Sequence, residues 1–116
     1  PTLCELAGMD KPKGIDGVSF APTLLGQSGK QEKREYLYWE FHERGGKQAV
    51  RMGKWKGIRL NVRKNKDAPI ELYDLSKDIG EEKNLADKHP DLVRKMAQAM
   101  ADSHTTNPNF PFLPGE

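Results

Sequence analysis

Three polar side chains able to take part in chemistry stand at alternate positions in the chain, Tyr38, Glu40 and His42. Alternate residues of a β-strand point to the same face, so this spacing places the carboxylate beside the imidazole. Such a pair can act as a general base with its orienting partner, or supply two ligands to a metal ion. A metal would need a third ligand, and the sequence offers none at recognisable spacing. The alternative is that His42 only closes the end of a strand.

The other histidines and the single cysteine give no stronger catalytic signal. His89 and His104 flank a predicted helix, where we expect them to be solvent-exposed residues at its two ends. Cys4 is the only cysteine, so the chain cannot form an internal disulfide. It stands on a predicted helix without a histidine nearby to activate it, and such a cysteine is usually buried and inert. These residues predict no catalytic site and no metal site within the chain.

Basic and aromatic residues are interleaved through the middle of the sequence and are typical of a surface for an anionic polymer. They are Arg44, Lys47, Arg51, Lys54, Lys56, Arg59 and Arg63, with Trp39 and Trp55 among them. The alternative is the solvated face of a sheet, which the interleaved Glu40 and Glu43 favour. No glycine-rich phosphate loop is present, because the glycines have the spacing of turns.

The composition indicates one modest domain with a thin core. Of 116 residues, 35% are hydrophobic and 31% are charged, and the mean hydropathy is −0.82. We therefore expect part of the apolar surface to meet a neighbouring domain. The net charge of +2 comes from charges spread along the chain, which argues against a nucleic-acid partner. The sequence shows no membrane span and no signal peptide. It begins with Pro1, and we expect it to be a piece of a longer protein.

Residues 1–34 are predicted to form the end of a helix followed by an irregular arm. Leu3, Leu6 and Ala7 share one helical face, and Gly8 stands where a left-handed C-terminal cap is expected. The following residues, 9–29, are rich in glycine and proline, which is typical of irregular chain packed against another body. The polar residues 26–35 indicate a connector, and a domain boundary is predicted there.

Residues 35–116 are predicted to form an α+β unit, a four-stranded antiparallel β-meander packed by a C-terminal α-helix. In residues 36–42 the apolar Leu37, Trp39 and Phe41 alternate with the polar set. Gly45-Gly46 predicts a tight hairpin, and Gly53-Lys54 predicts a two-residue type II′ turn. The strands after these turns are expected in residues 48–52, 55–62 and 70–75.

A helix is predicted from Pro90 to about Ser103, because proline suits a first helical position and Asp91 suits the positive end of the helix dipole. Its apolar side chains recur at helical spacing and should cover the sheet. They are Leu92, Val93, Met96, Ala97 and Met100. One helical turn is expected around residues 81–84, and the two phenylalanines of the tail are expected on the surface of the domain or of its neighbour.

Several motifs resemble the C-terminal region of type I sulfatases, the formylglycine-dependent arylsulfatase family. The first 26 residues resemble the end of the catalytic domain, with Asp16-Gly17-Val18-Ser19 and Leu24-Leu25-Gly26. Arg51, Gly53, Trp55 and Lys56 resemble the family's Arg-x-Gly-x-Trp-Lys hairpin. Residues 71–86 resemble its Glu-Leu-Tyr-Asp-Leu signature, carried by Glu71–Leu75, Asp78, Gly80, Glu81 and Asn84–Ala86.

The resemblance implies that this chain is the C-terminal part of a longer parent enzyme, whose catalytic residues lie outside it. Residues 1–34 would be the tail end of its α/β catalytic domain with a connector, and residues 35–116 would be the C-terminal subdomain. The parent would be a periplasmic or secreted sulfuric ester hydrolase that uses a formylglycine and calcium. The motif that directs formylglycine formation, Cys/Ser-x-Pro/Ala-x-Arg, is absent here, and Glu5-Leu6-Ala7-Gly8 follows Cys4. No catalytic residue is carried over, and these residues alone are expected to be inactive.

Substrate contact is the remaining role for the predicted hairpin tip. The family's cleft lies between the two domains, so His42, Glu43, Arg44 and Gln48 are candidate substrate-binding residues for a sulfated glycan or aryl sulfate. Imidazole, amide and guanidinium groups can bind its hydroxyls and negative charge. The alternative function is a free-standing module that binds an anionic glycan or single-stranded nucleic acid.

Overall fold

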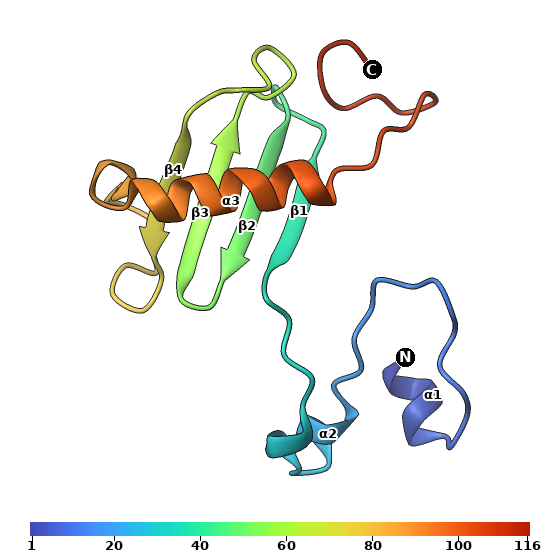
Figure 1. Ribbon diagram of the computed structural model, residues 1–116. Helices are drawn as coiled ribbons and strands as arrows, with labels where there is room; N and C mark the ends of the chain where they lie inside the picture. The colour runs from blue at the N-terminus through green and yellow to red at the C-terminus, as the bar shows by residue number, and fades with distance from the viewer. The chain divides into compact units, whose positions relative to one another are not determined.

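The computed structural model describes residues 1–116, which form two compact units, Pro1–Arg34 and Glu35–Glu116 (Figure 1). The first unit contains the short helices α1 (Thr2–Leu6) and α2 (Ala21–Leu24) and the 3₁₀ turn η1 (Ser28–Lys30). Gly8, with φ +68°, follows α1 in the left-handed conformation that its position predicted.

Hydrogen bonds rather than an apolar core hold the first unit together. The backbone N–H of Phe20 donates to Thr2 Oγ1 at 3.2 Å, and Gln31 Nε2 donates to the carbonyl of Ser19 at 2.8 Å. Most of its large apolar side chains are exposed, and Leu3 retains 80% of its accessible surface. The polar contacts therefore order this unit with little hydrophobic burial.

The second unit contains the predicted antiparallel meander, and its α+β class is confirmed. The strands are β1 (Leu37–Phe41), β2 (Lys47–Met52), β3 (Trp55–Leu60) and β4 (Ile70–Asp74), in the order β1-β2-β3-β4. The register pairs Glu40 with Gln48 and Gln48 with Arg59, so these three side chains start from the same face. Gly53 has φ +57° and Lys54 does not have a positive φ, as a type II′ turn requires.

Helix α3 (Pro90–Ser103) crosses one face of the sheet, with its start beside β4 and its end beside β1 (Figure 1). The core between them consists of Val50, Ile70, Leu72, Met96, Ala99 and Met100. Gly57 makes this crossing possible, since a Cβ there would lie 2.5 Å from Met96 Sδ and 3.3 Å from Ile70 Cγ2. No helix of the structure combines the length and the apolar character needed to cross a membrane.

The other face of the sheet carries no covering element within the second unit. Leu37, Trp39 and Phe41 point to this open face from β1 and are 39%, 49% and 47% exposed. Ala49 and Ile58 continue the apolar surface on β2 and β3, opposite the α3 face. The alternation in β1 therefore separates an apolar open face from a polar covered edge.

The loop between β1 and β2 differs from the predicted tight hairpin. It spans residues 42–46, and Arg44, Gly45 and Gly46 all have positive φ. The chain of residues 61–63 packs closely against it, since Val62 N–H donates to the Gly46 carbonyl at 3.2 Å. A Cβ on Gly45 would lie 2.6 Å from Asn61 Oδ1. The two glycines thus serve a close approach of two chain segments as well as a turn.

Two further local predictions were wrong. The helical turn lies at η2 (Ala86–Lys88) rather than at residues 81–84, because Asn84 Oδ1 accepts hydrogen bonds from the N–H groups of Leu72 and Ala86 and so starts the turn later. In the tail Phe110 is exposed, as predicted, but Phe112 is only 2% exposed. The tail therefore folds back and adds an aromatic side chain to the interior.

The Gly57–Met96 contact predicts a large effect of a side chain at position 57. Gly57→Val should lower the free energy of unfolding by about 1–3 kcal/mol, because overpacking displaces a fully buried methionine. Urea unfolding followed by tryptophan fluorescence measures the change. Met96→Ala should lower the free energy of unfolding by less in the Gly57→Val background than in the wild type, because the smaller side chain relieves the overpacking.

Gly80→Val provides the control, since a Cβ at Gly80 meets only the Glu82 side chain, at 3.5 Å or more. Equal losses for Gly57→Val and Gly80→Val, or strictly additive effects with Met96→Ala, would contradict the proposed steric basis.

Candidate functional site

Two of the polar residues of β1, Tyr38 and Glu40, form a network with the histidine that follows α3. Tyr38 donates its hydroxyl hydrogen to Glu40 Oε1, and the same oxygen lies 2.5 Å from Nδ1 of His104. His42, the predicted partner of Glu40, is not in this network. The carboxylate–imidazole pair anticipated in β1 is therefore formed with the histidine that follows α3.

His104 lies between two carboxylates and is not the exposed end residue that was predicted. Its Nδ1 faces Glu40 and its Nε2 contacts Glu116, while only 10% of its side chain is exposed. Glu116 Oε2 also accepts hydrogen bonds from the N–H groups of Phe112 and Leu113, at 2.8 and 3.0 Å. The return of the tail buries this ring, which explains the difference from the prediction.

These contacts change the acid–base behaviour of the network. Burial of His104 favours its neutral ring, but the hydrogen bonds and the attraction of Glu40 and Glu116 outweigh burial and raise its pKa. The backbone hydrogen bonds from Phe112 and Leu113 lower the pKa of Glu116 to about 2, and His104 adds to this effect. His104 is therefore held in its charged form over a wider pH range than a free histidine.

His42 lies at the mouth of the β1–β2 loop and contacts the aromatic side chains of the tail. The centroid of its ring is 4.1 Å from that of Phe110 and 4.6 Å from that of Phe112. Glu43 and Arg44 follow it on the exposed loop and form no ion pair. These three neighbours present an imidazole edge, a carboxylate and a guanidinium at one end of the sheet.

Gln48 is separated from these three residues by its burial. It is 2% exposed on the face that α3 covers, where its Nε2 donates to the hydroxyl oxygen of Tyr38 at 2.8 Å. Its Oε1 accepts a longer bond, 3.5 Å, from Arg59. Burial lowers the pKa of Arg59 and, with the Glu40 hydrogen bond, raises the pKa of Tyr38. Gln48 thus connects β1 to β3 beneath the loop.

Both ring nitrogens of His104 are occupied by contacts within the chain. The two carboxylates belong to Glu40 and Glu116, and the network also contains the Tyr38 hydroxyl, which donates to Glu40. No three His, Cys, Asp or Glu side chains come together in a group that would hold a metal ion. Cys4, a free and half-buried thiol, belongs to α1 in the first unit.

Sequence reasoning missed His104, Glu116 and Phe112 as parts of this site. Glu40 and His104 are 64 residues apart, and no spacing rule connects them. One signal could have indicated the contact of His104. A helix that covers the sheet must end near an edge strand, where a polar residue at its end can contact that strand.

The His104 network predicts a pH-dependent stability. Because the folded pKa is raised, the stabilisation is fully present below the unfolded value of about 6.5 and is lost as pH rises through the folded pKa. His104→Gln should therefore destabilise the chain more at pH 6 than at pH 9 in urea unfolding. NMR titration of the ring gives the folded pKa directly. An equal loss at both pH values would contradict the role of the charged imidazole.

Comparison with known proteins relates this chain to the C-terminal regions of sulfatases. Residues 1–106 match the protein family described as "N-sulphoglucosamine sulphohydrolase, C-terminal". The chain is 36% identical over 109 residues to a Delta 4,5-hexuronate-2-O-sulfatase of Bacteroides thetaiotaomicron, covering 91% of this chain and 22% of that protein. It is 32% identical over 120 residues to arylsulfatase A of Bos taurus, covering 86% of this chain and 24% of that protein.

A crystal structure from Bacteroides thetaiotaomicron VPI-5482 matches with a TM-score of 0.72 and 30% sequence identity. The match covers 100% of this chain and 29% of that one. The chain thus spans about a quarter of the length of the proteins that it resembles. Because the family match extends over nearly all its residues, the chain belongs to the N-sulphoglucosamine sulphohydrolase C-terminal family of sulfatase domains.

Proposed function

We propose that this chain is the C-terminal portion of a sulfatase that hydrolyses sulfate esters of glycans or aryl compounds. The family match over residues 1–106 carries the proposal. The sulfatase relatives support it, since the chain aligns with only 22% and 24% of their lengths. In this proposal a preceding catalytic domain supplies the residues that hydrolyse the ester. The parent enzyme works in the periplasm or outside the cell.

The formylglycine and the calcium ion expected for the parent do not fit the residues of this chain. Cys4 lacks the sequence that directs its conversion, and no acidic cluster is arranged around a possible ion. We assign no step of ester hydrolysis to these residues. Residues 1–34 complete the catalytic domain in this proposal, and residues 35–116 form a subdomain that supports it.

The proposed contribution to substrate recognition comes from the mouth of the β1–β2 loop. Arg44 offers a guanidinium to a sulfate or carboxylate group, while Glu43 can accept hydrogen bonds from sugar hydroxyls. The ring of His42 is held against Phe110 and Phe112, so its remaining edge has a fixed direction. Gln48 is too deeply buried for direct contact in this arrangement and would position the loop through Tyr38.

Among sulfate esters, sulfated saccharides suit this surface best. A sugar presents several hydroxyls and a charged group, which match the carboxylate, imidazole and guanidinium of residues 42–44. The name of the hexuronate-2-O-sulfatase relative supports the same class. Aryl sulfates remain the second class, supported by the arylsulfatase A relative.

The gene and a simple assay test the division of function. Sequencing upstream should reveal a Cys/Ser-x-Pro/Ala-x-Arg motif in the same reading frame. The intact protein should hydrolyse sulfate esters, and the 116 residues alone should give no turnover. Turnover by these residues alone would overturn the proposal. A gene that encodes little beyond them would instead favour a free-standing module for an anionic glycan.

Substitutions at His42 test its proposed contact with substrate in the intact enzyme. His42→Ala should lower kcat/KM for a sulfated saccharide by about 10-fold, because it removes one hydrogen bond to a charged or polar group of the substrate. His42→Phe keeps an aromatic ring against Phe110 and Phe112 but removes both ring nitrogens, and it should lose a similar factor. The exposed Lys66→Ala should leave kcat/KM unchanged.

Full activity of His42→Phe, with loss in His42→Ala alone, would show that the ring only packs against the tail. Unchanged kcat/KM in both variants across several sulfated sugars would remove His42 from the substrate site.

A further inference from the structure

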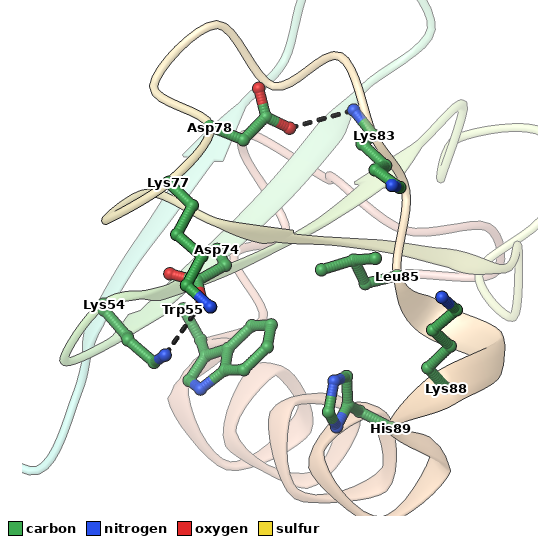
Figure 2. Close-up of a pocket in the computed structure, with 9 residues that line it drawn as sticks. All are labelled: Lys54, Trp55, Asp74, Lys77, Asp78, Lys83, Leu85, Lys88 and His89. Carbon is green, nitrogen blue, oxygen red and sulfur yellow. Dashed lines mark hydrogen bonds and ion pairs between the residues drawn. The ribbon is translucent and has the colours of Figure 1, made fainter.

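A second polar surface lies at the opposite end of the sheet from the β1–β2 loop. It is a cavity of about 490 Å³ beside the β2–β3 turn, the end of β4 and the start of α3 (Figure 2). This volume falls within the range of small-molecule sites. Lys54, Lys77 and Trp55 lie on one side of the opening, and Leu85, Lys88 and His89 lie on the other (Figure 2).

The cavity has an excess of positive charge. Four lysines and two aspartates line it, which gives a net charge of +2 without His89. Lys54 is paired with Asp74 at 2.8 Å, but Lys77, Lys83 and Lys88 form no ion pair. Three of the lysines that line the cavity therefore have no internal counter-charge of their own.

The two acidic side chains of the cavity are committed to other contacts. Asp74 accepts hydrogen bonds from Lys54 and from both the N–H and hydroxyl of Ser76. Asp78 accepts from the backbone N–H groups of Glu82 and Lys83, the latter at 2.9 Å. These bonds fix the loop that carries the lysines. The aspartates thus order the rim and leave the ammonium groups to an external anion.

Apolar side chains form the walls between the charges. Trp55 is half-buried, with the centroid of its ring 4.7 Å from that of His89, and Lys54 Nζ lies 5.0 Å from the indole centroid. Leu85 is held beside β4 by a hydrogen bond from its N–H to the Leu72 carbonyl at 2.8 Å. Such walls suit the C–H surfaces of a sugar ring better than a fully hydrated inorganic ion.

We propose that this cavity binds a sulfated saccharide, with Lys77, Lys83 and Lys88 contacting its sulfate groups and with Trp55 and Leu85 contacting its ring. Lysine acts as a compact point charge that can bind the oxygens of a tetrahedral anion, and the cavity is lined by lysines without an arginine. The choice of a saccharide as the carrier of the sulfates rests on the proposed function. The site would hold a part of a long substrate that extends along the second unit.

NMR titration of the 116-residue chain with a fully sulfated heparin tetrasaccharide tests this site. Shifts should concentrate in the backbone amides of residues 77–89 and in the indole N–H of Trp55. Lys83→Ala/Lys88→Ala should weaken binding at least 10-fold. Lys64→Ala/Lys66→Ala removes the same charge from the exposed β3–β4 loop and should weaken it less than 3-fold.

Three other outcomes would overturn the site. Equal weakening by both double variants would indicate attraction by net charge alone. Equal binding of the desulfated tetrasaccharide, or of sodium sulfate alone, would remove the requirement for a sulfated sugar. Shifts confined to residues 42–48 would place the ligand elsewhere. Failure of the intact protein to hydrolyse sulfate esters would overturn the proposed function and leave this binding result intact.

Discussion

The contact between Gly57 and Met96 determines how the second unit is assembled. Without a side chain at position 57, the helix can approach the middle of β3 and bury Met96 completely between the sheet and itself. The direction of α3 then fixes which residues reach each edge. His89 is placed beside Trp55 near the end of β4, and His104 is placed beside Glu40 on β1. Both polar surfaces of the unit depend on this one crossing.

The hydrogen-bonded network of His104 at the β1 edge also fixes the C-terminal tail, which has no regular secondary structure. A protonated His104 attracts Glu40 and Glu116 together, and Glu116 fixes the tail through two backbone N–H groups. Phe112 is thereby held in the interior, where it also supports the ring of His42. An electrostatic contact thus positions an aromatic contact, which in turn orients a residue on the exposed loop.

Local patterns were sufficient to predict most of the fold. The alternation in residues 36–42 predicts a strand, Gly53-Lys54 predicts a turn, and Pro90 predicts the start of a helix. Each of these signals depends only on residues close to it in the sequence. The site depended on contacts between distant segments. Glu40 and His104 meet only because α3 runs from β4 to β1, and the burial of Phe112 requires the tail to return to the sheet. The five-residue β1–β2 loop was misjudged for the same reason, because residues 61–63 pack against Gly45 and Gly46.

The open face of the sheet affects how this unit behaves in solution. Leu37, Trp39 and Phe41 form a hydrated apolar strip on an edge strand whose outer hydrogen-bonding groups have no neighbouring strand. Two copies can bury such strips against each other, so the apparent mass should increase with protein concentration and decrease in mild detergent. Dimers formed in this way would reflect the hydrophobicity of one sheet face rather than a biological assembly.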